Sequence, residues 1–198
     1  MALKAFSSFL FVVIGVVGMF LNRTTGFAQL FIVLGLFASV FGDLFLALLE
    51  FKFGNKEHKI KIGMVCFSVA HIFYIIGLNF LCGFEYFYIS ISSAVLIALA
   101  VVFGEKMLKL NYGGCKLFVG GYSYFLGASL VQSLVTAIVC GFSLSTVVLL
   151  VGFVLFFASD LVLSFIYFGK NWNRKLYYPN LALYYLAQIL IASMVFFV

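Results

Sequence analysis

Two aspartates and a histidine stand inside strongly apolar stretches of this 198-residue chain. Asp43 and Asp160 are the acidic residues that fall well within apolar runs, and His71 is the histidine that does so. A charge in hydrocarbon costs several kcal/mol, so groups of this kind indicate a functional site by default. Because carboxyl and imidazole groups donate and accept protons, they predict acid and base catalysis or a proton relay.

The composition places these residues in a membrane. The chain is 66% hydrophobic and 9% charged, has a single proline, and has a mean hydropathy of +1.24. A soluble domain of this length cannot hide so much apolar surface. We therefore expect an all-α integral membrane bundle that forms one domain over residues 1–198.

Apolar runs of about 20 residues, the length that spans a bilayer, predict the helices that position the site. They cover approximately residues 5–21, 26–49, 63–82, 86–103, 117–140, 146–168 and 180–198. No small-x-small cleavage site follows the first run, so we interpret it as a retained helix and not as a signal peptide. The expected bundle has about seven transmembrane helices.

The basic residues distinguish the two sides of this bundle. With seven spans, eleven of the 12 Lys and Arg residues fall on one side and only Arg23 falls on the other. The positive-inside rule then predicts a cytoplasmic N-terminus and an external C-terminus. This topology explains the net charge of +6. The sequence has no basic stretch interleaved with aromatic residues, so it does not predict nucleic-acid binding.

Polar side chains from several helices are expected at one depth in the cytoplasmic half of the membrane. At 1.5 Å of rise per residue, they lie about 6 to 12 Å from the inner ends of their helices. These residues are Asp43, His71, Tyr122, Asp160, Tyr184 and Gln188. Tyr74 shares a helix face with His71, and Tyr184 shares one with Gln188. Together these faces predict one polar cavity.

Small residues surround the first aspartate. Gly35, Ala38, Ser39 and Gly42 share one helix face with Asp43, at spacings of three and four residues. A stripe of small residues lets a neighbouring membrane helix approach closely. We therefore expect another helix to pack directly beside Asp43.

Four motifs in register resemble a known family of membrane proteins. They are Gly42-Asp43, Ser68-Val69-Ala70-His71-Ile72-Phe73-Tyr74, Ser159-Asp160 and Tyr184-Tyr185-Leu186-Ala187-Gln188. Their order and spacing are similar to those of the YhhN, or lysoplasmalogenase-like, family, from about residue 4 to the end. Members of that family usually have eight helices and a Lys-Pro near the start of the second, whereas Lys4 here has no proline after it. The resemblance therefore predicts that the family's first helix is missing.

The resemblance implies hydrolysis of the vinyl-ether bond of lysoplasmalogens to a fatty aldehyde and a glycerophospho-base. An enol ether breaks when a proton adds to carbon and water then adds to the oxocarbenium ion. The site needs one proton donor and one carboxylate that stabilises the cation and orients water. Because two carboxyls in a medium of low dielectric constant do not easily both ionise, we expect Asp43 and Asp160 to divide these roles. Which of them is the acid stays open.

The resemblance also suggests roles for the other polar residues. We expect His71 to donate a hydrogen bond or a proton. The side chains expected to hold water or the substrate glycerol are those of Tyr74, Tyr122, Tyr184 and Gln188. The inner-side cations expected near a phosphate headgroup are Lys56, Lys59, Lys61 and Arg174. The expected partners are a lysophospholipid substrate and membrane lipids, without a cofactor or metal.

Other classes of membrane protein fit these residues less well than this hydrolase does. The alternative is a proton-coupled transporter of a small molecule or lipid, although no proline or glycine pair breaks a helix at mid-depth. A retinal sensor is disfavoured because the last helix has no lysine for a Schiff base. A zinc site with three histidine ligands is excluded because the chain has only His58 and His71. The chain contains no Gly-x-Ser-x-Gly elbow, so its sequence does not predict a serine hydrolase. The expected location is a bacterial inner membrane, or the endoplasmic reticulum of a eukaryote.

Overall fold

Seven α-helices account for the apolar runs in the computed structural model, which describes residues 2–22, 26–48, 55–170 and 174–197. They are α1 (Ala2–Leu21), α2 (Phe27–Ala47), α3 (Lys56–Cys82), α4 (Phe87–Gly104), α5 (Lys116–Val139), α6 (Leu144–Phe168) and α7 (Tyr177–Ser193). Within those ranges there is no strand, only an isolated bridge between Leu110 and Gly169. A helix satisfies its own backbone polar groups in lipid, and the predicted all-α class is confirmed.

The lengths of these helices suit a membrane. The six helices from α2 to α7 are long and apolar enough to span a bilayer, and α1 contributes a shorter apolar stretch, Phe6–Leu21. The chain is therefore a multi-pass membrane protein. The cytoplasmic placement of its N-terminus stays a prediction.

Helix α3 begins at Lys56, well before the expected start near residue 63. The Asn55 side chain caps it by accepting a hydrogen bond from the Glu57 backbone N–H at 2.9 Å. Glu57 also pairs with Lys61 one turn later, at 3.8 Å. The expected boundary was wrong because the apolar run measures the membrane span, while the charged turns before it are also good helix formers.

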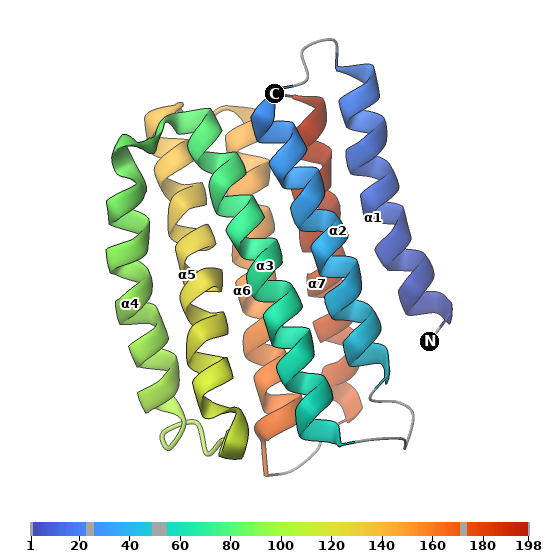
Figure 1. The fold of residues 1–198 in the computed structure, drawn as a ribbon, viewed down its shortest axis with the longest axis vertical. Helices are drawn as coiled ribbons and strands as arrows, with labels where there is room; N and C mark the ends of the chain where they lie inside the picture. The colour runs from blue at the N-terminus through green and yellow to red at the C-terminus, as the bar shows by residue number, and fades with distance from the viewer. Residues whose placement is uncertain (1, 23–25, 49–54, 171–173, 198) are drawn as a thin grey trace.

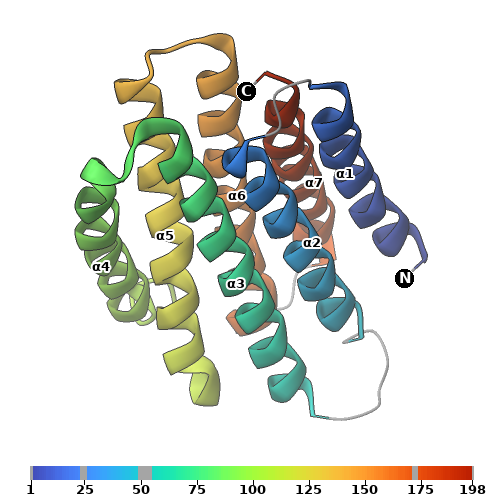
Figure 2. The same cartoon turned by 45° about the horizontal axis from the view of Figure 1, so that its top comes forward.

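Six of the helices enclose a common core, and α4 lies outside it. Around the core, α1 packs on α2, α2 on α3, α3 on α5, α5 on α6, α6 on α7, and α7 closes the ring on α1. Figure 1 shows α4 at one edge of the bundle, beside α5, and Figure 2 shows the same arrangement from a second angle. Polar side chains from six helices can therefore converge, while α4 covers α5.

The closest packing joins α2 to α3 through the predicted stripe of small residues. A Cβ atom on Gly42 would lie 2.6 Å from the Phe67 ring, and one on Gly35 would overlap the Tyr74 ring. Only glycine leaves room for these rings, so the expected close approach beside Asp43 is confirmed. The stripe fixes the position of Asp43 against an aromatic wall on α3.

Candidate functional site

Asp43 is held by donors from two other helices. Its Oδ2 atom accepts hydrogen bonds from the Ser8 hydroxyl on α1 at 2.6 Å and from the Tyr184 hydroxyl on α7 at 2.8 Å. Tyr184 is fixed in turn by edge-to-face contacts with Phe67 and Phe156, at centroid distances of 6.0 and 5.4 Å. Asp43 is thus a positioned acceptor on α2.

A buried chain of hydrogen bonds continues from Tyr184 into the core. The Gln188 amide donates to the Tyr184 hydroxyl at 3.1 Å, and the Tyr74 hydroxyl donates to Gln188 Oε1 at 3.0 Å. Tyr74 also lies 3.3 Å from the Ser39 hydroxyl. Tyr74 and Gln188 are completely buried. This chain therefore supports the position and orientation of the Tyr184 hydroxyl from behind.

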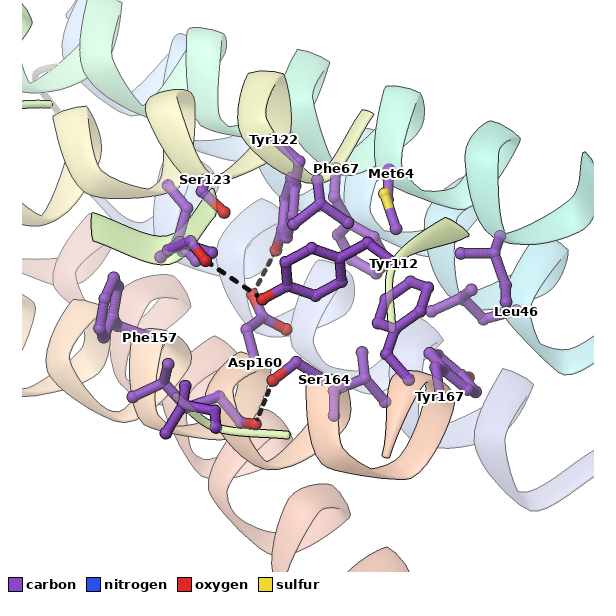
Figure 3. A pocket seen from close by; sticks show the side chains of 18 residues that line it. Leu46, Met64, Phe67, Tyr112, Tyr122, Ser123, Phe157, Asp160, Ser164 and Tyr167 are labelled. Atoms are coloured by element: carbon purple, nitrogen blue, oxygen red, sulfur yellow. Dashed lines mark hydrogen bonds between the residues drawn. The ribbon is translucent and has the colours of Figure 1, made fainter. Parts of the chain in front are cut away.

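Asp160 is the second carboxyl group, and it lies on α6. Its Oδ2 atom accepts a hydrogen bond from the Tyr122 hydroxyl on α5. Figure 3 shows Asp160 beside Tyr122 and the ring of Tyr112. Close by, the Asn180 amide on α7 donates to the backbone carbonyl and hydroxyl oxygens of Ser159, at 2.8 and 3.1 Å. Asp160 is therefore held by α5, while α7 holds the preceding residue, Ser159.

The two carboxyl groups line one cavity of about 410 Å³. Tyr184, Asn180 and the lysine Lys56 contribute to the same walls. The cavity thus combines two carboxyl groups, four tyrosines, a serine, an amide and one cation inside a membrane bundle. In the ranges described, no three His, Cys, Asp or Glu side chains gather as a metal-binding group.

A second, smaller cavity lies on the other side of Asp160. It has a volume of about 90 Å³ and is lined mainly by apolar residues of α3, α5 and α6 and by the connection between α4 and α5. Figure 3 shows Phe157, Met64 and Leu46 around it, with Asp160 in its wall. Asp160 therefore faces both a polar and an apolar space.

His71 lies deeper than the carboxyl groups and lines neither cavity. Its Nδ1 atom is 2.8 Å from the Ser129 hydroxyl, and its Nε2 atom has no hydrogen-bond partner among the described residues. The ring packs against Phe156 at 4.8 Å and is fully buried. Phe67, one turn earlier on the same face of α3, lines both cavities instead. His71 therefore lies on the interior face of α3, as expected, but one turn deeper than the cavities.

The expected headgroup cations have different positions. Lys56 lines the polar cavity, whereas the Lys59 ammonium donates to the Leu48 carbonyl at 2.6 Å. Lys61 lies above the Phe118 ring, 5.6 Å from its centroid, in addition to its ion pair on α3. The Arg174 side chain lies outside the described part of the structure. Among the expected lysines, Lys56 is therefore the one that the fold brings to the carboxyl groups.

The connection between α4 and α5 closes the apolar cavity from one end. Glu105 accepts a hydrogen bond from the Lys116 ammonium at 2.7 Å and one from the Tyr112 backbone N–H at 2.7 Å, and these interactions lower the pKa of Glu105. Tyr112 is buried in the cavity wall, and this burial raises the pKa of its phenol. The Asn111 N–H donates to the Phe168 carbonyl at 2.9 Å, which ties the connection to the end of α6.

Sequence reasoning missed Ser8 and Tyr112. Ser8 and Ser7 are the polar residues of the first apolar run, which was the available signal for a partner of Asp43. The sequence pattern places Tyr112 in a loop, and no neighbouring residue indicates that this loop packs against the cavity. Asn180 lies one turn before Tyr184 on the same face of α7, and its bonds to Ser159 require the packing of α6 on α7.

A protein-family model described as the YhhN family matches residues 1–195. The matched range contains all four motifs and every residue of both cavities described above. A search of curated proteins and a search of solved structures found no match. The family expected from the motifs is therefore confirmed.

Proposed function

This chain belongs to the YhhN family, and from that premise we propose that it is a membrane-embedded hydrolase that cleaves the vinyl-ether bond of lysoplasmalogens. The products are a fatty aldehyde and a glycerophospho-base. The observation that carries the proposal is the cavity of about 410 Å³ that has both Asp43 and Asp160 in its walls. It supplies the proton donor and the carboxylate that this reaction requires.

The hydrogen bonds suggest which carboxyl group does which step. Asp43 accepts two hydrogen bonds on one oxygen, which suits a carboxylate that faces a developing cation. Asp160 borders the apolar cavity as well, so it is placed to reach the hydrocarbon side of the substrate. We therefore assign Asp160 as the acid and Asp43 as the carboxylate.

The proposed reaction balances with one water molecule. Asp160 gives its proton to the vinyl carbon farther from oxygen, and Asp43 stabilises the resulting oxocarbenium ion. Water adds to this ion while Asp43 takes one of its protons. The hemiacetal then collapses as its hydroxyl proton passes to Asp160 and the proton on Asp43 passes to the glycerol oxygen. Both aspartates return to their starting states.

The remaining polar residues would bind and orient the substrate. The Lys56 ammonium suits the phosphate of a lysophospholipid drawn from the surrounding membrane. Tyr122 and Tyr184 position the carboxyl groups, while Tyr74, Gln188 and, deeper, His71 support them from the core. The bilayer would be a bacterial inner membrane or the endoplasmic reticulum.

Aldehyde release by the purified protein tests the proposal. Wild type, Asp43→Asn and Asp160→Asn are incubated with a lysoplasmalogen in detergent, with EDTA in a parallel reaction. Glu105→Gln is the matched control, because it makes the same carboxyl-to-amide change outside the cavity. We expect EDTA-insensitive aldehyde from wild type and Glu105→Gln and none from the folded aspartate variants. Folded wild type that releases no aldehyde would overturn the proposal.

A further inference from the structure

The apolar cavity beside Asp160 has the properties of a hydrocarbon-binding site. Its polar wall is confined to Asp160, three tyrosines and two serines, and the rest of its lining is aliphatic or phenylalanine side chains. One of those serines, Ser164, bonds its hydroxyl to the Leu161 carbonyl of its own helix, at 2.7 Å. The space therefore suits an apolar group.

The apolar cavity adjoins the polar cavity. Leu46, Phe67, Asp160, Leu163 and Tyr167 line both spaces. A molecule with one polar end and one hydrocarbon chain matches this pair of spaces, with its junction at Asp160. In a vinyl-ether lysolipid that junction is the bond to be cleaved.

The apolar cavity also reaches the lipid-facing surface. Leu161 on α6 is 41% exposed and Leu108 in the α4–α5 connection is 45% exposed, and both line the cavity. Because α4 packs mainly on α5, it leaves this side of α6 accessible to lipid. A lipid chain can therefore approach sideways from the bilayer between α6 and the connection.

We propose that this cavity binds the hydrocarbon chain of a single-chain lipid, which arrives laterally between α6 and the α4–α5 connection. The proposal rests on the proposed function for the position of the cleaved bond. The cavity volume of about 90 Å³ is small beside a complete lipid chain. The first carbons of the chain bind in the protein, and the remainder extends into the bilayer.

Photolabelling tests the chain site without any bond cleavage. The probe is a saturated ether lysophospholipid with a diazirine on one of the first carbons after the ether oxygen. We expect the label on α5, α6 and the α4–α5 connection. Ser123→Phe fills the cavity and Ser164→Phe narrows its lipid-facing side, so both should lower labelling several-fold. Val154→Phe is the matched control, because Val154 is 48% exposed on α6 and lines no cavity described here.

The outcomes separate the two proposals. The chain site is supported if the cavity is labelled, if Ser123→Phe or Ser164→Phe reduces this labelling, and if Val154→Phe does not. This holds even if wild type releases no aldehyde. Label confined to outward-facing residues, or equal in all folded variants, overturns the chain site, even if aldehyde is released. In an active protein, kcat/KM should rise as the first carbons of the chain are added and then level off once the chain extends beyond the cavity.

Discussion

Two groups of polar side chains, one half-buried and one fully buried, lie in opposite halves of the bundle, and they differ in kind. One is the pair of carboxyl groups at the polar cavity. The other surrounds Gln132 on α5, where the Ser90 hydroxyl donates to its Oε1 atom at 2.5 Å. Its amide donates to Asn79 Oδ1 at 3.3 Å and to the Cys82 sulfur at 3.2 Å. We call Gln132, Asn79, Ser90 and Cys82 the amide cluster.

The two groups differ in their surroundings as well as in their chemistry. The amide cluster contains amide, hydroxyl and thiol groups, its members bond to one another, and none of them lines a cavity described above. It joins α3, α4 and α5 as interhelical hydrogen bonds do elsewhere. Asp43 and Asp160, in contrast, border open volume. A carboxyl group beside open volume indicates chemistry, whereas an amide within a closed network indicates architecture.

The largest expected effect is at Asp160. Asp160→Asn keeps the acceptor for Tyr122 but removes the acid, so kcat should fall about 10²- to 10⁴-fold with little loss of stability. Aldehyde release and thermal unfolding in detergent measure the two quantities. If the variant is less stable but its folded fraction has the kcat of wild type, then Asp160 has a structural role like that of the amide cluster.

The reverse result is expected at Gln132. Gln132→Met keeps the size of the side chain but leaves Asn79 and Ser90 without their partner, which should lower the free energy of unfolding by about 1 to 3 kcal/mol. Denaturant titration in mixed micelles measures this loss. The kcat of the folded fraction should equal that of wild type, and a specific loss of kcat would break the comparison.

An intermediate effect is expected at Tyr184. Tyr184→Phe keeps the ring packed on Phe67 and Phe156 but removes the donor to Asp43, so kcat should fall about tenfold, the equivalent of one hydrogen bond. Tyr178→Phe, on the same helix, is the control for a lost phenol, because Tyr178 is 76% exposed and lines neither cavity. Equal kcat in both variants would show that the Tyr184 bond is structural.

A smaller effect is expected at Lys56. Lys56→Gln should raise KM for a lysophospholipid about three- to tenfold with little change in kcat, because an exposed cation contributes about 1 kcal/mol to phosphate binding. Lys61→Gln is the control, since Lys61 pairs with Glu57 and lines neither cavity. If both variants raise KM equally, general surface charge explains the effect.

The smallest effect is expected at Glu105. Its pKa is lowered in the folded protein, so its contribution to stability is present above its ordinary pKa and is lost as the pH falls through the folded pKa. Glu105→Gln should therefore lower the melting temperature slightly at neutral pH, and the difference from wild type should disappear in acid. A difference that grows in acid would contradict this assignment.

The fold could be predicted from the sequence because apolar runs of membrane-spanning length leave few alternatives to helices. The runs identified all seven helices, and the glycine stripe predicted that another helix approaches α2 closely, which in the structure is α3. The start of α3 was misplaced because charged turns extend a helix beyond the membrane. The peripheral position of α4 had no counterpart in the sequence pattern.

The candidate site could be predicted in part. Asp43, Asp160 and Tyr184 were recognisable as polar groups in apolar runs, and they line the polar cavity. His71 gave the same signal and is packed one turn deeper, because depth along a helix depends on where the helix begins. Ser8 could not be assigned from sequence, since a serine in a membrane helix gains meaning only from its neighbour on another helix.

The bonds to Asp43 also bear on how the protein is made. Its donor Ser8 belongs to the preceding helix, but its donor Tyr184 follows 141 residues later on α7. Asp43 therefore enters the bilayer during synthesis long before its second donor exists. The polar cavity is completed only when α7 packs between α1 and α6. Catalytic activity would thus report complete insertion of the chain, because a ribosome-bound intermediate without α7 carries both aspartates but no finished site.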